Sequence, residues 1–273
     1  MKIGLVGAGA LGTVLAGQLS RAGHGVQIAN SRGAHTLRDV EMQTGARAVG
    51  IEAVGQDVDL LILAIPLGRT PQLPRALLDT LPATVPVVDT GNYVPSRDGT
   101  LTDIEAGMPE TVWTSRQTGR PLVKAFNSVS EISLAQRARP AGAKDRVALP
   151  VAGDDAGHRA TVMRLVETLG FDALDAGPLA DSWRQQLGTP AYCTDPDRRQ
   201  LVRLRARARH DALGRQRAQA MQLMRKLPSD FPKPVLLRVA RLMAGLDRAH
   251  PASWLALARL AWALRPGRAA AAG

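Results

Sequence analysis

Three glycines near the start of the chain have the spacing of a phosphate-binding turn. The apolar run 2–6 leads into Gly7-Ala8-Gly9-Ala10-Leu11-Gly12, and apolar residues then recur at helical spacing. In such a strand–turn–helix the first glycine permits the tight turn, the second lets backbone approach a pyrophosphate, and the third lets the helix pack close to the strand. The N–H groups at the helix start then face the phosphates. The pattern predicts a dinucleotide site that includes Gly7, Gly9, Ala10, Leu11 and Gly12.

The end of the second apolar run indicates which dinucleotide is bound. A strand predicted over 25–29 ends at Asn30-Ser31-Arg32. An NAD site usually has Asp or Glu about 20 residues past the glycines, where the carboxylate binds the ribose 2′-hydroxyl. Here Ser31 can donate a hydrogen bond to a 2′-phosphate and Arg32 can pair with it through two N–H groups, whereas a carboxylate would repel it. We therefore expect NADPH/NADP, with Asn30, Ser31 and Arg32 at its ribose.

Apolar runs and helical stretches alternate over the first 180 residues. Strands are expected near 2–6, 25–29, 46–49, 59–65, 85–89, 122–126, 146–152 and 171–175, and helices near 35–44, 52–56, 73–81 and 157–170. This order predicts an α/β protein with a Rossmann-type doubly wound parallel sheet and a C-terminal helical extension.

In a doubly wound sheet, ligands bind beyond the carboxyl ends of the strands. That rule adds to the cofactor site Ile65, Pro66, Asn92, Ala125, Phe126 and Asn127. Simple packing is an alternative role for the four apolar residues, and capping of a turn is an alternative role for the two asparagines.

Charge divides the chain into two parts. Residues 1–180 hold 17 Lys and Arg against 18 Asp and Glu, whereas residues 181–273 hold 18 against 6. This shift in composition predicts an NADP-binding Rossmann domain over 1–180 and a basic helical C-terminal segment over 181–273. Within the basic segment we expect helices over 197–226, 234–246 and 253–264, and a disordered tail over 265–273.

The last two predicted helices carry apolar residues at helical spacing, with arginines between them. We expect them to form the contact of a homodimer, because a symmetric dimer is the commonest way to cover such a patch. Peripheral contact with an anionic membrane surface is a less favoured alternative. Nucleic acid is not favoured as a partner, because aromatic residues are scarce and no recognition motif is present.

Several classes of protein are excluded by composition. No apolar run reaches the roughly 18 residues of a membrane span. Cys193 is the only cysteine, so we expect neither an internal disulfide nor a cysteine-based metal site, and no metal. Because the first strand begins at residue 2, no signal peptide is expected, and a cytoplasmic location is the simplest interpretation.

Several segments, in order and spacing, resemble one known family. They are GAGALG at 7–12, NSR at 30–32, AIP at 64–66, VDTGNY at 88–93, VKAFNS at 123–128, VAGDD at 151–155 and LDAGPL at 174–179. This set, over roughly residues 1–190, resembles the NADPH-dependent reductases of the deazaflavin coenzyme F₄₂₀ and the related reductase domain of the STEAP metalloreductases. The resemblance implies hydride transfer between NADPH and a flavin-like ring, with F₄₂₀, FMN or FAD as the small-molecule acceptor. It also implies that Ser31 and Arg32 hold the 2′-phosphate and that residues 125–127 lie by the nicotinamide.

The sequence assigns no catalytic acid or base. None of the five histidines follows a predicted strand. Hydride exchange between two stacked rings needs mainly positioning and exclusion of water, so this absence fits the reaction. Two alternatives stay open: a two-domain dehydrogenase of the ketopantoate reductase type, which the lack of Glu over 168–273 disfavours, and an NADPH-binding sensor or scaffold without turnover.

Overall fold

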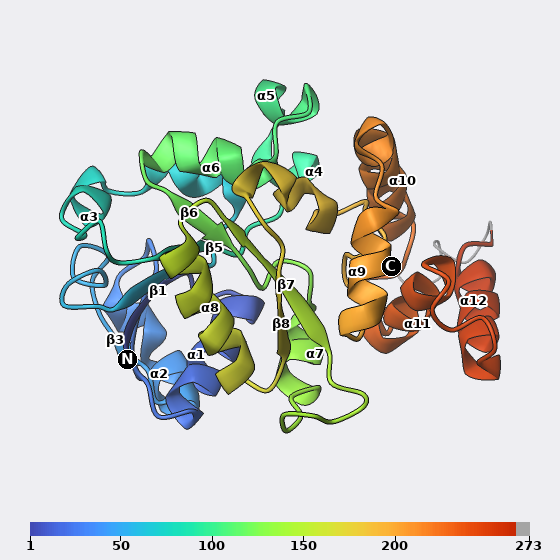
Figure 1. Cartoon of the computed structure of the whole chain (residues 1–273), viewed down its shortest axis with the longest axis horizontal. Coiled ribbons are helices and arrows are strands. Elements are labelled where there is room, and N and C mark those ends of the chain that lie inside the picture. The colour runs from blue at the N-terminus through green and yellow to red at the C-terminus, as the bar shows by residue number, and fades with distance from the viewer. Residues whose placement is uncertain (266–273) are drawn as a thin grey trace.

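In the computed structural model, which describes residues 1–265, a sheet of eight strands carries helices on both faces (Figure 1). The strand order is β3-β2-β1-β4-β5-β6-β7-β8. The strands are β1 (Lys2–Val6), β2 (Gly25–Ala29), β3 (Arg47–Ala48), β4 (Leu60–Leu63), β5 (Val87–Asp89), β6 (Leu122–Lys124), β7 (Ala148–Gly153) and β8 (Asp172–Asp175). The predicted Rossmann-type fold with a C-terminal helical extension is confirmed.

The helices follow the predicted alternation. They are α1 (Ala10–Arg21), α2 (Arg38–Thr44), α3 (Arg75–Asp79), α4 (Pro95–Asp98), α5 (Thr102–Glu105), α6 (Glu110–Thr118), α7 (Glu131–Gln136), α8 (Ala156–Thr168), α9 (Arg198–Ala206), α10 (Leu213–Arg225), α11 (Lys233–Met243) and α12 (Pro251–Ala263). Short 3₁₀ helices cover 34–37, 67–72, 179–185 and 210–212. The helix predicted over 52–56 is wrong, since this segment consists of turns. The predicted helix 197–226 is two helices, because the chain turns between α9 and α10.

The direction of the last two strands differs from the predicted all-parallel sheet. Strands β1 to β6 pair in parallel, but β7 pairs antiparallel to β6, with Val123 opposite Gly153 and Lys124 opposite Ala152. Strand β8 then pairs parallel to β7. A strand buried on both faces reads as a continuous apolar run in either direction, so composition does not reveal this reversal. The reversal places the amino-terminal half of β7 beyond the carboxyl end of β6.

Buried apolar side chains form a core on each face of the sheet. On one face α1, α7 and α8 contribute Leu15, Leu134 and Leu165 to a cluster with strand residues such as Ile62 and Val123. On the other face α3 contributes Leu77 and Leu78 to a cluster with Leu61 and Val87. Because side chains of a strand alternate between faces, neighbours such as Leu61 and Ile62 enter different clusters.

Two glycines of the first turn are required by the close approach of β1, α1 and β4. Gly7 has φ +113°, and a Cβ there would lie 2.2 Å from the Ala64 carbonyl oxygen. A Cβ on Gly12 would lie 2.0 Å from the Gly7 carbonyl oxygen. Both separations are shorter than any real contact: a side chain at Gly7 would collide with the end of β4, and one at Gly12 would push α1 away from the turn after β1.

The C-terminal helices continue outward from β7 and β8 (Figure 1). Leu201 and Leu204 of α9 pack with Ala148 of β7. Farther out, α11 and α12 pack against each other through Val239, Ala256 and Leu260. No helix in the described part of the chain is long and apolar enough to cross a membrane. The division at 180/181 stays a prediction, and the tail predicted to be disordered lies, apart from Arg265, outside the described residues.

Candidate functional site

The carboxyl ends of the central strands form one continuous edge. Backbone hydrogen bonds tie the first residues past each strand to the neighbouring strand: Gly7 N donates to Ala29 O at 2.8 Å, and Ala64 N donates to Val6 O at 2.8 Å. The loops that follow β1, β2 and β4 therefore begin side by side. This brings the predicted glycine turn, the Asn30–Arg32 turn and Ile65-Pro66 to the same edge.

Helix α1 presents its N-terminus at this edge. Its N-cap is Gly9, which has ordinary extended backbone angles and no side chain to accept from the helix N–H groups. Gly9 and Ala10 are exposed, and a Cβ on Gly9 would meet nothing within 4 Å. Unlike Gly7 and Gly12, Gly9 is thus not required by the packing of the protein itself. Open space before unpaired helix N–H groups is what a bound pyrophosphate needs.

The turn after β2 is shaped by Asn30. Its Oδ1 accepts a hydrogen bond from the backbone N–H of Arg32 at 2.9 Å, and its Nδ2 donates to Thr36 Oγ1 at 2.9 Å. These contacts hold the turn while the side chains of Ser31 and Arg32 stay exposed at its tip. Residues 30–38 contain no acid. The tip therefore offers a hydroxyl and a guanidinium beside the glycine turn, which suits a phosphate better than a ribose hydroxyl.

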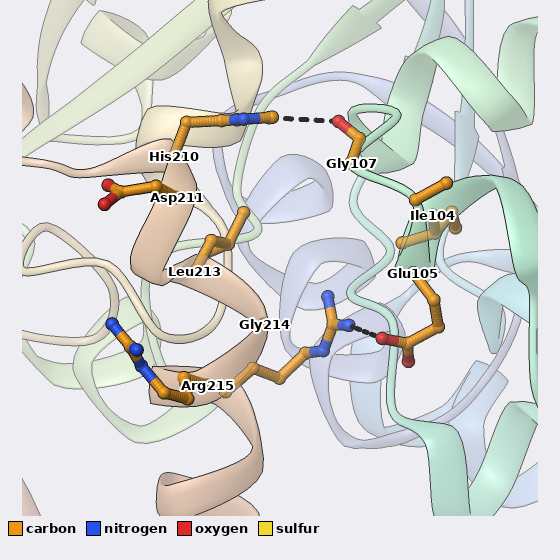
Figure 2. A pocket seen from close by; sticks show the side chains of 10 residues that line it. Ile104, Glu105, Gly107, His210, Asp211, Leu213, Gly214 and Arg215 are labelled. Carbon is orange, nitrogen blue, oxygen red and sulfur yellow. Dashed lines mark hydrogen bonds and ion pairs between the residues drawn. The ribbon is translucent and has the colours of Figure 1, made fainter.

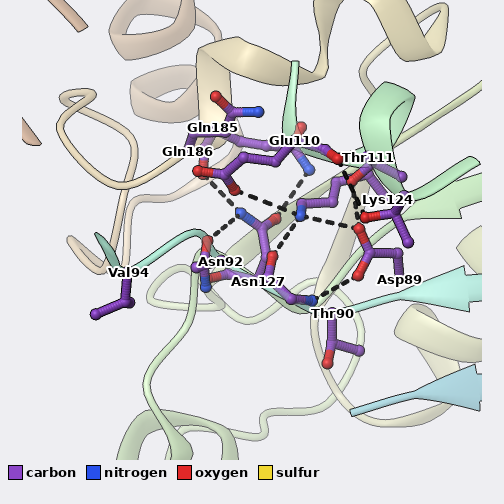
Figure 3. Close-up of polar contacts among 12 residues, drawn as sticks. Asp89, Thr90, Asn92, Val94, Glu110, Thr111, Lys124, Asn127, Gln185 and Gln186 are labelled. Atoms are coloured by element: carbon purple, nitrogen blue, oxygen red, sulfur yellow. Dashed lines mark hydrogen bonds and ion pairs between the residues drawn. The ribbon is translucent and has the colours of Figure 1, made fainter. Parts of the chain in front are cut away.

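The two predicted asparagines bond to each other across the ends of β5 and β6 (Figure 3). Asn92 Nδ2 donates to Asn127 O at 2.9 Å, and Asn127 Nδ2 donates to Asn92 Oδ1 at 3.1 Å and to Gln185 O at 2.8 Å. Gln185 Nε2 returns a hydrogen bond to Asn127 Oδ1 at 3.1 Å, and Arg205 Nη1 donates to Gln185 Oε1 at 2.8 Å. This amide network joins the sheet edge to the basic segment.

Residues 125–127 are buried at the end of β6. Phe126 is fully buried and has φ +59°, a left-handed backbone that costs a non-glycine residue about 1 kcal/mol or more. Asn127 is directed into the amide network rather than into solvent. Half-buried Ile65, Pro66 and Asn92 thus form the accessible surface of this edge, and residues 125–127 lie behind it.

A buried ion cluster lies directly beneath the Asn92 turn (Figure 3). Asp89 and Lys124 face each other in the β5–β6 register, with Lys124 Nζ 3.3 Å from Asp89 Oδ2. Lys124 Nζ also donates to Gly91 O, and Asp89 Oδ1 accepts from Gly91 N at 2.8 Å. Thr111 of α6 donates to Asp89 Oδ2 at 2.6 Å. The N–H and the C=O of Gly91 are therefore both hydrogen-bonded to buried side chains of the cluster. These bonds fix the turn that carries Asn92.

Glu110, the first residue of α6, is the second carboxylate of this cluster. Its Oε2 lies 3.8 Å from Lys124 Nζ, and both side chains are fully buried. Burial raises the pKa of Glu110 to about 7, because loss of solvation outweighs the stabilising charge of Lys124. Glu110 therefore changes protonation near neutral pH inside the protein.

Sequence reasoning missed Lys124, Asp89 and Glu110. The signal was present: Asp89 and Lys124 each end an apolar run, and consecutive parallel strands place such residues opposite each other. A single lysine at the end of an apolar run is also what an exposed strand end would carry, so the composition alone does not distinguish Lys124 from a surface residue. All three are buried, and their contacts are with the turn rather than with open space, so they act as positioning residues.

A pocket of about 360 Å³ opens where the basic segment meets the loop after α5 (Figure 2). Arg217 Nη2 pairs with Glu105 at 2.7 Å, and its guanidinium stacks on the Tyr93 ring at 4.7 Å from the ring centre. His210 Nε2 lies 3.0 Å from Gly107 O. Arg217, which lines this pocket, therefore connects it to Tyr93, the residue after Asn92 in the β5 turn, and Tyr93 itself is buried behind that arginine.

Together, the fold and the glycine turn define a Rossmann-type nucleotide-binding protein. Residues 2–93 match the family of coenzyme F₄₂₀-dependent NADP oxidoreductases, so the resemblance predicted from the sequence is confirmed over that segment. This match supports NADP-dependent oxidoreduction as the class of chemistry.

Three relatives illustrate how far the similarity extends. The Escherichia coli (strain K12) protein YjhV is 42% identical over 64 residues, which are 23% of this chain and 47% of that protein; the match thus spans about half of its length. The hypothetical protein SMa0349 of Sinorhizobium meliloti is 29% identical, with a TM-score of 0.60, over 70% of this chain and 92% of that one. A protein of Arthrobacter sp. FB24, provisionally named an F₄₂₀-dependent NADP-reductase, is 24% identical with a TM-score of 0.56, over 66% and 86% of the two chains.

The glycine turn generates the first prediction. Gly9→Val weakens NADPH binding at least about tenfold, because its side chain enters the space in front of the helix N-terminus, and it costs at most about 1 kcal/mol of stability. Gly12→Ala instead lowers the free energy of unfolding by about 1–3 kcal/mol, because its Cβ meets the Gly7 carbonyl. Titration with NADPH and urea unfolding of both variants test this. Equal effects of the two substitutions on binding and stability would contradict the division of roles.

The buried cluster of Asp89, Glu110 and Lys124 generates the second prediction, which concerns the pH dependence of stability. The folded pKa of Glu110 lies above the ordinary value of 4.5, so the native state holds a proton that the unfolded chain releases. Its contribution to stability is therefore present below about pH 4.5 and is lost as the pH rises through about 7, by about 3 kcal/mol in total. Glu110→Gln removes this dependence.

Urea unfolding of both proteins between pH 5 and 8 measures the difference. The matched control is Glu52→Gln at an exposed position, which leaves the pH profile of the wild type unchanged. Parallel profiles for wild type and Glu110→Gln would show that Glu110 is ionised throughout this range.

Proposed function

We propose that this protein is an oxidoreductase that transfers hydride between NADPH and a flavin or deazaflavin ring. The observation that carries the proposal is one arrangement at the sheet edge. The open, exposed helix N-terminus at Gly9 lies beside a turn whose exposed tip carries Ser31 and Arg32 and no acid. A pyrophosphate at the first and a 2′-phosphate at the second account for both features with one ligand.

Each group of residues then has a distinct task in binding NADPH. The α1 N-terminus binds the pyrophosphate, and Ser31 and Arg32 bind the 2′-phosphate. Ile65, Pro66 and Asn92 border the ring end, where apolar contact excludes water and the buried Asn92–Asn127 network keeps the surface rigid. Bound NADPH supplies the hydride, and the protein supplies orientation without a proton-transfer residue at that surface.

The acceptor of the hydride is a flavin-like ring. The family match favours F₄₂₀, and FMN or FAD are the alternative rings that the resemblance implies. The pocket lined by Arg217, whose guanidinium packs on Tyr93, is the place that we assign to the second substrate. Its lining holds Arg215 and Arg217 together with Glu105 and Asp211, so its charge alone does not select among these rings. A cytoplasmic location likewise remains a proposal.

Cofactor preference is tested first. Arg32→Ala removes the charge-assisted contact with the 2′-phosphate, a contact typically worth about 1.5–3 kcal/mol, and so weakens NADPH binding by at least about tenfold while NADH binding stays nearly unchanged. Arg116→Ala, an exposed arginine on α6, is the control and changes neither. Isothermal titration with both cofactors gives the answer, and equal losses for NADPH and NADH would refute the assignment.

Turnover is tested with the purified wild-type protein and NADPH. We expect oxidation of NADPH at 340 nm with at least one of F₄₂₀, FMN and FAD, each supplied in separate assays, and no oxidation with Gly9→Val. Tight NADPH binding without turnover of any of the three rings would show that the protein is an NADPH-binding sensor or scaffold rather than an enzyme of this type. Efficient reduction of a 2-oxo acid instead would favour the ketopantoate reductase type.

A further inference from the structure

The outermost helix of the structure, α12, is apolar on both sides. Its inner side packs on α11 through Ala256 and Leu260. Its outer side carries Trp254, Leu255 and Trp262, which are 54%, 71% and 48% exposed. A helix that is apolar all round is normally enclosed on all sides. In Figure 1, α12 lies at the rim of the molecule farthest from the sheet, where no other element of the described chain covers it.

These exposed residues form one stripe. Positions 251, 254, 255, 258 and 262 recur at intervals of three and four, so they lie on the same face of the helix. We call this stripe of Pro251, Trp254, Leu255, Ala258 and Trp262 the outer face of α12. The indole N–H of Trp254 already donates to Arg248 O at 2.8 Å, so Trp254 can enter an apolar medium without leaving that donor unpaired. Exposed tryptophans at such a face are typical of the interface between lipid and water.

The charges on α12, and next to it in the chain from residue 248, all have one sign. Arg259 and Arg265 are exposed on or next to it, and Arg248 and His250 precede the helix. Residues 248–273 contain four arginines and no acid. The last acid before them, Asp247, is bound by Arg241 at 2.7 and 2.8 Å. A partner that covers this face must therefore be apolar at its centre and negative at its rim.

This requirement distinguishes the candidate occupants. A second copy of the chain, which the sequence led us to expect here, would bring the same arginines together across a two-fold axis, with no acid on the helix to pair with them. An anionic lipid surface supplies both parts: acyl chains for the tryptophans and leucine, and phosphate groups for the arginines. We propose that the outer face of α12 binds peripherally to a bilayer that contains anionic lipid.

The full-length protein and vesicles test this directly. We expect the protein to sediment with vesicles of equal parts phosphatidylglycerol and phosphatidylcholine at least about tenfold more strongly than with phosphatidylcholine alone, and high salt to release it. Tryptophan emission reports the contact, because Trp113 and Trp183 are buried while Trp254 and Trp262 are exposed. Emission therefore moves to shorter wavelength and acrylamide quenching falls on anionic vesicles only.

Two pairs of variants assign the binding to this face. Trp254→Ala with Leu255→Ala lowers partition onto anionic vesicles at least about tenfold, because the variant lacks the two exposed apolar side chains that would be buried in the bilayer. The matched control, Val202→Ala with Met224→Ala, removes apolar side chains of similar exposure from α9 and α10 and leaves partition unchanged. Arg259→Gln weakens binding about threefold or more, whereas Arg116→Gln does not. Circular dichroism and NADPH titration confirm that the variants remain folded.

Three outcomes would overturn the proposal. The first is equal binding to neutral and anionic vesicles. The second is absence of vesicle binding together with a dimer in light scattering that Trp254→Ala with Leu255→Ala dissociates, which would assign the face to a second copy. The third is absence of vesicle binding together with retention on single-stranded DNA, which would assign it to nucleic acid. None of these outcomes depends on whether the protein reduces a flavin-like ring.

Discussion

The ion pair between Lys124 and Asp89 connects most of what is specific about this structure. It lies in the β5–β6 register, fully buried, and it holds both backbone groups of Gly91. From Gly91 the chain passes to Asn92, which bonds to Asn127, and Asn127 bonds to Gln185 and through it to Arg205 of α9. Removing solvent from two charges is costly, and an apolar pair of similar volume is often as stable. What a buried pair adds here is a fixed geometry for one turn.

Glu110 makes this cluster sensitive to its surroundings. The carboxylates of Asp89 and Glu110 share the single ammonium of Lys124, so one positive charge faces two groups that can be negative. The fully buried Glu110 is the one whose pKa rises, to about 7. Arg205, at the other end of the network, is a positively charged group that also loses solvation. Burial lowers the pKa of its guanidinium to about 10. Both values follow from placing charge where solvent is absent. The side chains that fix the sheet edge, Lys124 and Arg205 among them, are thus charged groups with little access to solvent.

Much of the fold was predictable, and the limits have physical reasons. Strand positions follow from apolar runs, and the roles of Gly7 and Gly12 follow from spacing, because both depend on local geometry. The reversal of β7 was not predictable, since a strand buried on both faces has no direction in its composition. The inward direction of Asn127 depends on Gln185, 58 residues away in the chain, and at the α9–α10 break Ala208 and Leu213 pack on Trp183. Contacts of this kind have no local signature in the sequence.

The arginine-rich composition of the C-terminal segment has two separate explanations. Arg205, Arg217 and Arg241 point inward, where they bind carbonyl oxygens, Gln185, Glu105 and Asp247. Arg205 and Arg217 attach the segment to the Rossmann core through Ala176 O and Glu105, whereas Arg241 joins α11 to the carbonyls of residues 194 and 195 within the segment. Each can do so because a guanidinium can satisfy several acceptors at once. Arg248, Arg259 and Arg265 instead surround an apolar helix face and are exposed. The net charge of the segment therefore combines arginines that hold the structure together with arginines that are exposed, and it does not separate the two roles.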